Sequence, residues 1–97
     1  MDKYNIIILN LCKYYGIEFK ELDLLLRDRE KRLIFLLLIK NFRCLDVNKT
    51  IDMTRYINEK NIKVNLKKAE EKVLINKQFR EDYFEIEEKI KKNFKNA

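Results

Sequence analysis

The chain contains no proline and a single glycine, Gly16, in 97 residues. Small domains rich in β-strands normally place several of both residues at their turns. This sequence instead alternates apolar clusters with Lys, Glu and Arg at helical spacing. A chain of this length has room for one hydrophobic core. The sequence therefore predicts an all-α fold, a compact bundle of about five to six helices in one domain over residues 1–97.

Apolar spacing predicts where the first helices lie. The first helix is expected to begin at Asp2 or Tyr4 and to end before Gly16, since glycine suits the left-handed position after a helix. A shorter helix over residues 19–26 would turn four apolar side chains inward: Phe19, Leu22, Leu25 and Leu26. A third helix over residues 29–42, with Asp28 as its N-cap, is apolar nearly all round from residue 33 to residue 39. A helix of that kind is buried on most faces, so we expect it at the centre of the core.

The second half of the chain predicts a helix-turn-helix. Residues 44–57 contain a helix with Asp46 as its N-cap, and residues 58–61 form a polar turn in which asparagine can adopt left-handed angles. The helix that follows carries Leu66, Ala69 and Val73 on one face, where they would dock it on the core. The alternation over residues 62–66 also fits a short strand, which would indicate a winged helix.

The last predicted helix runs from Asn76 or Lys77 to Phe94. Its stripe of apolar residues, Phe79, Tyr83, Ile86, Ile90 and Phe94, is narrow. Such a stripe packs either on the core or on a second subunit. The second possibility keeps a homodimer or a protein partner open.

The start of the helix after residue 58 is basic and bears amides, as the recognition helix of a DNA-binding protein requires. The candidate DNA-binding residues on or just before it are Lys60, Asn61, Lys63, Asn65, Lys67 and Lys68. Asparagine can form a bidentate pair with adenine, lysine can donate to guanine, and Lys60 suits a phosphate. The net charge of +6 also favours an anionic partner. A solvated lysine face is the alternative interpretation.

Three stretches carry a resemblance to a known family. Residues 12–17, Cys-Lys-Tyr-Tyr-Gly-Ile, end the first predicted helix, residues 32–40 form an arginine-led apolar helix, and residues 66–73 form the second half of the expected recognition helix. Together they resemble the C-terminal DNA-binding domain of the bacterial chromosomal replication initiator (DnaA-type), of the Trp-repressor-like helix-turn-helix group. The resemblance covers residues 7–94. It implies a free-standing, sequence-specific double-stranded DNA-binding protein of plasmid, phage or accessory regulatory type.

The resemblance also assigns a second contact. In that family the loop before the central helix approaches the DNA backbone or the minor groove, and residues 27–32 stand in its place. Arg27 and Arg29 are therefore candidate DNA-binding residues, since arginine suits a narrow A·T-rich minor groove. The alternative is a run of surface charges paired with Asp28 and Glu30. For Arg32, which leads the central helix, a structural role is at least as well supported.

The base-reading positions depart from the family. There the turn and the first turn of the recognition helix read arginine, aspartate, histidine, serine or threonine, threonine, valine. The matching residues here are Asn61, Ile62, Lys63, Val64, Asn65 and Leu66. Only Leu66, the apolar residue that anchors the helix, is of the same kind as the family's residue at its position. The DNA sequence that the initiator recognises is therefore not expected to be the target of this chain. The alternative function is therefore a protein-interaction adaptor derived from a DNA-binding fold, which would use the amphipathic C-terminal helix.

Other classes of protein find little support. The sequence has two cysteines, Cys12 and Cys44, and no histidine, so we expect free, buried thiols, no metal site and no cofactor. No catalytic constellation stands out, and we expect no enzyme activity. The longest apolar runs, residues 6–9 and 33–39, are too short to cross a bilayer. A cytoplasmic protein without a membrane partner is the expectation.

Overall fold

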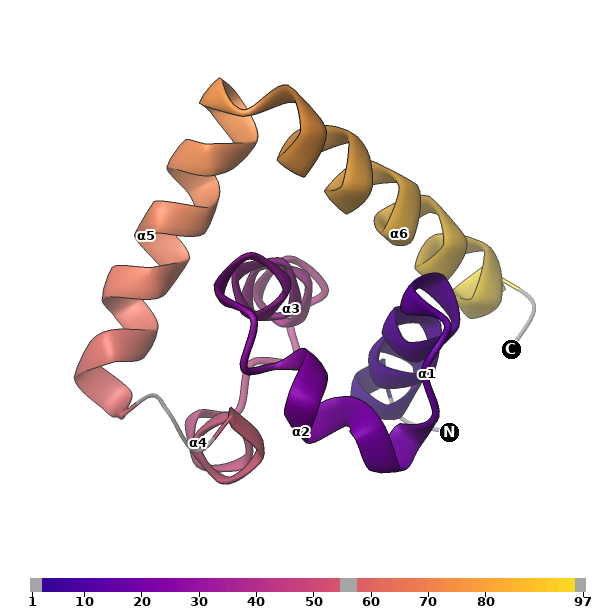
Figure 1. Cartoon of the computed structure of the whole chain (residues 1–97), viewed down its shortest axis with the longest axis horizontal. Helices are drawn as coiled ribbons and strands as arrows, with labels where there is room; N and C mark the ends of the chain where they lie inside the picture. The colour runs from indigo at the N-terminus through magenta and orange to yellow at the C-terminus, as the bar shows by residue number, and fades with distance from the viewer. Residues whose placement is uncertain (1–2, 55–57, 96–97) are drawn as a thin grey trace.

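The computed structural model of the chain describes residues 3–54 and 58–95. In chain order its elements are α1 (Lys3–Tyr15), the 3-10 turn η1 (Phe19–Glu21), α2 (Leu22–Leu25), α3 (Arg29–Asn41), α4 (Val47–Thr54), α5 (Glu59–Ile75) and α6 (Lys77–Lys95) (Figure 1). The described part of the chain contains no strand, and the predicted all-α fold is confirmed. The winged alternative is wrong, because residues 62–66 lie inside α5.

The helix α3 is the centre of the molecule. Figure 1 looks along its axis and shows α1, α2, α4, α5 and α6 arranged around it. All seven of its residues from 33 to 39 are buried, at 3% exposure or less. A helix that is apolar on every side needs neighbours on every side, and the prediction of a central helix is confirmed.

Two helices end in the same way. Gly16 has a φ of +66°, and the amide of Ile17 donates to the carbonyl of Cys12, at 3.0 Å. At the end of α3, Arg43 has a φ of 58°, and the amide of Cys44 donates to the carbonyl of Ile39, at 2.9 Å. Both are left-handed helix ends of the Schellman type. The predicted stop at Gly16 is confirmed, whereas α3 ends in this way without a glycine.

The helix starts depend on short polar side chains. The Asp28 carboxylate accepts from the amide of Lys31 at 3.1 Å, and the Asp46 carboxylate accepts from the amide of Lys49 at 3.0 Å. Each satisfies one of the amides that a helix leaves without a partner in its first turn. Both predicted N-caps are confirmed. Residues 55–57, which the predicted helix over 44–57 also included, lie outside the described residues.

The predicted turn at residues 58–61 is wrong. Asn58 is extended (φ −96°), and its side chain accepts from the amide of Asn61 at 2.9 Å, so it is the N-cap of α5. Neither asparagine is left-handed, since Gly16 and Arg43 are the described residues with positive φ. A polar run led by asparagine fits a turn and a capped helix equally well, and here the cap starts a helix one turn earlier than expected.

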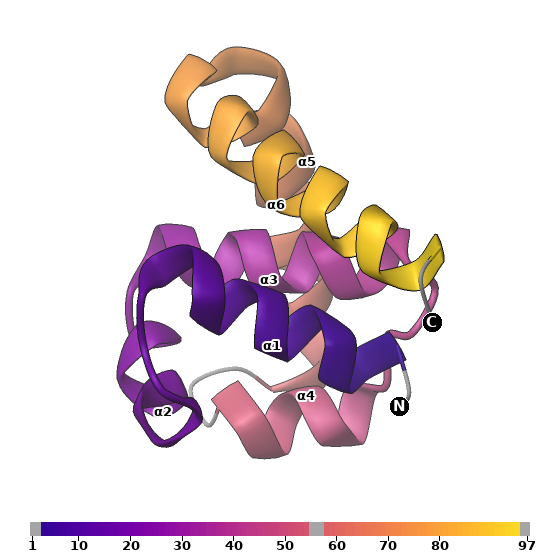
Figure 2. The ribbon, with the colours of Figure 1, turned by 90° about the vertical axis from the view of Figure 1, so that its right-hand side faces the viewer.

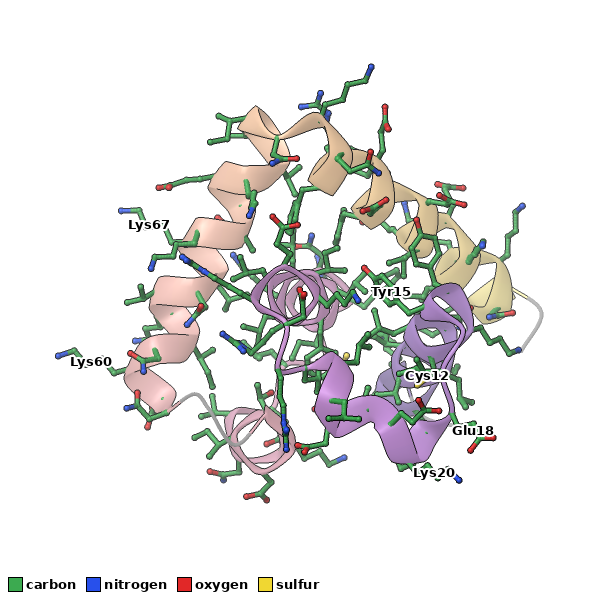
Figure 3. The ribbon with its side chains drawn as sticks, viewed as in Figure 1. Cys12, Tyr15, Glu18, Lys20, Lys60 and Lys67 are labelled. Atoms are coloured by element: carbon green, nitrogen blue, oxygen red, sulfur yellow. The ribbon has the colours of Figure 1, made fainter. Side chains whose placement is uncertain are left out.

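The short second helix is also different from the expectation. It divides into η1 and α2, and Phe19 is 62% exposed, whereas Leu22, Leu25 and Leu26 are buried as predicted. Figure 3 places Glu18 and Lys20 at the periphery of the molecule. Phe19 lies between them in the sequence, three residues before Leu22. The face of this segment that is buried at Leu22 is therefore already exposed to solvent at Phe19.

The apolar stripe of α6 packs inward. Phe79, Tyr83, Ile86 and Ile90 are each 2% exposed or less, and α6 packs on α1, α3 and α5. The Tyr83 hydroxyl accepts from Asn41 Nδ2 at 2.6 Å and donates to Glu87 Oε2 at 2.8 Å. The stripe was predicted to pack either on the core or on a second subunit, and in the structure it packs on the core.

Two further expectations concern the whole chain. Cys12 is buried and Cys44 is half-buried, so full burial holds for Cys12 alone, and neither forms a disulfide within the described residues. Within the described ranges, no helix combines the length and the apolar character that crossing a bilayer requires.

The centre of the core gives a first prediction. Leu36→Ala removes a side chain that is fully buried in α3 and should lower the free energy of unfolding by about 2–5 kcal/mol, because it leaves a cavity. Leu24→Ala is the matched control, since Leu24 is 60% exposed and its loss should change stability by about 0.5 kcal/mol or less. Urea unfolding followed by circular dichroism measures both. Equal effects would contradict the placement of α3.

The buried tyrosines predict alkaline instability. Burial raises the pKa of Tyr4 and of Tyr15 to about 12, and burial, followed by the hydrogen bond to Glu87, raises the pKa of Tyr83. In the unfolded chain tyrosine ionises near pH 10. The folded state therefore keeps its full stability below about pH 10 and loses stability as the pH rises from 10 through 12.

The variant Tyr83→Phe tests the predicted loss of stability at alkaline pH. The variant lacks one group with a raised pKa, so its stability should fall less steeply than that of the wild type between pH 10 and pH 11. Urea unfolding at pH 8, 10 and 11 measures the difference between the two proteins at each pH. A difference that stays constant from pH 8 to pH 11 would contradict the assignment to Tyr83.

Candidate nucleic-acid interface

The helix α5 is held by one apolar face. Ile62, Leu66 and Ala69 are buried at 8% exposure or less, and Val73 is partly buried against the same core. This face packs along α3, and the last part of α5 also packs on α6. The predicted docking stripe is confirmed, and Ile62 extends it by one turn toward the N-terminus.

The opposite side of α5, which we call the outer face, points to solvent. Val64 lies at its middle, opposite the buried stripe, and is 47% exposed. Two polar rows flank it, Lys60, Lys63 and Lys67 on one side and Asn61, Asn65 and Lys68 on the other. Figure 3 shows that Lys60 and Lys67 point away from α3. Six of the predicted DNA-binding residues therefore lie together on about two and a half turns of one helix.

The four lysines of the outer face form no ion pair with any residue that the structure describes. Within the described residues, no carboxylate oxygen lies within 4.0 Å of Lys60, Lys63, Lys67 or Lys68. The flanks of α5 differ, since Lys72 pairs with Glu30 at 2.6 Å and Glu70 pairs with Lys40. Like charges on two successive turns produce a positive potential that an anion would relieve.

Asn65 is more constrained than the lysines. Its side chain is half-buried, and Nδ2 donates to the carbonyl of Asn61 at 2.7 Å, one turn earlier. An asparagine amide has two N–H donors and one acceptor oxygen. The second N–H and the oxygen of Asn65 therefore remain for a base edge. Asn61 is exposed at the start of the same row.

The arginines of residues 27–32 separate into three environments. Arg29 lines a shallow hollow of about 290 Å³ together with Lys68 and Lys72 of α5. Arg27 instead pairs with Asp23 at 3.3 Å. Arg32 Nη1 donates to the carbonyl of Leu26 at 3.0 Å, so it holds the α2–α3 junction, as the structural interpretation predicted. The structure brings Arg29 to α5, whereas Arg27 does not line this hollow.

The alternative interpretation paired these arginines with Asp28 and Glu30, and the structure shows further partners for both carboxylates. The Asp28 carboxylate caps α3, and Glu30 pairs with Lys72. Lys72 was not predicted as part of the site. Its position four residues after Lys68 on α5 was the available signal, because residues four apart share a helix face. The ammonium of Lys72 also lies 5.7 Å from the centre of the Phe79 ring, which suits a structural role.

The arrangement of α4 and α5 is that of two consecutive helices that cross steeply. In Figure 1, α4 is seen nearly end-on, whereas α5 lies across the view. α4 ends at Thr54 and α5 begins at Glu59. The two helices are in contact, with Thr50 of α4 fully buried.

Comparison with known proteins gives no relative. No family model, no curated protein and no solved structure matches the chain. Among the residues that the structure describes, no group of three His, Cys, Asp or Glu side chains could hold a metal ion. A functional interpretation therefore depends on the geometry and the charge of the chain itself.

Proposed function

We propose that this protein binds double-stranded DNA as a helix-turn-helix, with α5 in the major groove. The outer face of α5 carries the proposal, because it combines four lysines that form no ion pair with a described residue, two asparagines and the exposed Val64. The opposite face of the same helix is fixed to α3, so the outer face is presented as a rigid unit. The major groove of B-DNA, about 12 Å wide, admits an α-helix.

Each residue of the outer face has a chemical role in this proposal. Along the helix, Lys60 lies at the start of the outer face and Lys67 and Lys68 lie at its end, where they neutralise phosphates, which position the protein without reading sequence. Lys63 donates to guanine, and Asn65 pairs with adenine through its remaining N–H and its oxygen. Val64 projects from the middle of the face, where an apolar side chain suits a thymine methyl group.

Arg29 supplies a contact outside the recognition helix. It lies beside Lys68 in the hollow between α3 and α5, so both cations face one stretch of backbone or minor groove. The resemblance to the DnaA-type domain supports the same docking, since it pairs a recognition helix with a basic loop before the central helix. We infer the same class of role, a small regulatory protein of plasmid, phage or accessory type.

The adaptor alternative required the amphipathic stripe of α6 as a partner surface. That stripe lies in the core, with Phe79 and Tyr83 each 2% exposed. The lysines of α5 are exposed. The available surface therefore favours an anionic partner over a protein that would dock on the α6 stripe.

Lys67→Ala should weaken binding to all duplexes by the same factor. A selection from random duplexes first provides a preferred site, and titrations at several salt concentrations then compare that site with an unrelated duplex. Loss of one phosphate contact should lower the slope of log K against log salt by about 0.9. Lys20→Ala is the control, because Lys20 pairs with Glu18 at the far end of the molecule in Figure 3.

Asn65→Ala should act on specificity instead. Loss of the amide should relax the preference at one base pair and cost about 1–3 kcal/mol there, with a smaller effect on unrelated duplexes. Repeating the selection with this variant measures the change. If neither Lys67→Ala nor Asn65→Ala altered binding to the selected duplex, the proposed docking would be wrong. An absence of binding even at low salt would leave the adaptor.

A further inference from the structure

A second basic hollow lies between α1 and α6. It has a volume of about 310 Å³ and is lined by Asn10, Lys13, Tyr14, Lys89, Lys92 and Asn93. Figure 2 shows α1 and the second half of α6 on the side facing the viewer, with α5 behind them. In Figure 1 the same two groups lie on opposite sides of α3. We call this site the α1–α6 hollow.

Three ammonium groups surround this hollow. Lys13 and Lys92 form no ion pair with a described residue. Lys89 lies 5.1 Å from the centre of the Tyr14 ring and has a distant carboxylate, that of Glu85, at 3.9 Å. The packing of α1 on α6 holds these like charges together without full compensation, and a bound anion would lower their mutual repulsion.

The floor of the hollow is a fixed pair of amides. Asn10 is 6% exposed, and its Nδ2 donates to the carbonyl of Ile6 at 2.8 Å. Its oxygen accepts from Asn93 Nδ2 at 2.7 Å, which sets the orientation of the Asn93 amide. One N–H of Asn93 remains for a ligand, because each amide nitrogen carries two hydrogens. The hollow thus adds a neutral donor to its positive charges.

The side chains of the hollow suit a phosphate of a nucleic acid backbone. Lysine acts as a flexible point charge and lacks the planar fork that gives arginine its geometric selectivity. Lys13, Lys89 and Lys92 are all exposed, so the hollow is open to a large ligand. Lysine and asparagine contacts to phosphate oxygens hold a duplex without reading its sequence.

The position of the hollow decides which duplex it contacts. The described chain measures 35 × 29 × 24 Å, and the core around α3 separates the hollow from the outer face of α5. A straight duplex that contacts the outer face of α5 therefore does not reach the α1–α6 hollow on the other side of α3. We propose that the α1–α6 hollow binds the phosphate backbone of a second duplex, so that one molecule bridges two duplexes. The bridge rests on the proposed function of α5.

The test is a capture experiment with the full chain. One duplex is immobilised on beads, the protein is added, and retention of a second, fluorescent duplex of unrelated sequence is measured. The wild type should retain it. Lys13→Gln/Lys92→Gln should reduce retention by roughly tenfold or more, since each lost phosphate contact lowers the association constant by nearly that factor at 0.1 M salt. Its affinity for a single duplex in solution should stay within about twofold.

A matched control variant removes the same number of positive charges at other positions on the surface. Lys20→Gln/Lys91→Gln removes two lysines that pair with Glu18 and Glu87, at 3.2 and 3.3 Å, and should retain the second duplex as the wild type does. Equal retention by the wild type and by Lys13→Gln/Lys92→Gln would overturn the proposal and would point to a bridge made by two α5 faces in a dimer. A wild type that binds one duplex and never captures a second would overturn it as well.

Failure of the α5 proposal is measured separately. Lys60→Gln/Lys67→Gln should lose affinity for a single duplex in solution, and unchanged affinity would contradict the role of α5 alone. In that variant the α1–α6 hollow is intact. Addition of duplex should therefore still shift the side-chain amide NMR signals of Asn10 and Asn93, and signals that stay in place would contradict the role of the hollow alone.

Discussion

Burial of α3 on every side is the constraint on which the rest of the structure depends. A helix whose residues 33–39 are all apolar cannot leave any face in water without a cost of roughly 25 cal/mol per Å². The remaining helices therefore surround it, and each contributes one apolar stripe. α5 is held by Ile62, Leu66 and Ala69. The outer face of α5 is positioned because its inner face has to cover α3.

The start of α5 determines which side chains reach that outer face. Asn58 accepts from the amide of Asn61, which places residues 59–61 inside the helix. If α5 began after Asn61, Lys60 would leave the row that it forms with Lys63 and Lys67, and Asn61 would leave the row of Asn65. One side-chain cap thus connects local sequence to the width of the proposed interface.

Much of this arrangement was predictable, because it depends on local periodicity. The central α3, the α6 stripe and the docking residues Leu66 and Ala69 all follow from residues three and four apart. The start of α5 was not predictable in the same way, because a polar run led by asparagine suits a turn and a cap equally. The meeting of Arg29 with Lys68 and the convergence of Lys13 with Lys92 join elements far apart in sequence, and periodicity holds no information about such pairs.

The distribution of ion pairs sharpens the interpretation of the net charge of +6. On the flanks of α5, Lys72 and Glu70 pair with residues of α3, so charge there supports packing. On the outer face, and at Lys13 and Lys92 of the α1–α6 hollow, the lysines lack such partners among the described residues, whereas Lys89 of the hollow has Glu85 at 3.9 Å. Part of the excess charge is collected on two opposite surfaces, and each would release its own counterions on binding, so a bridge between two duplexes would depend on salt more steeply than either contact alone.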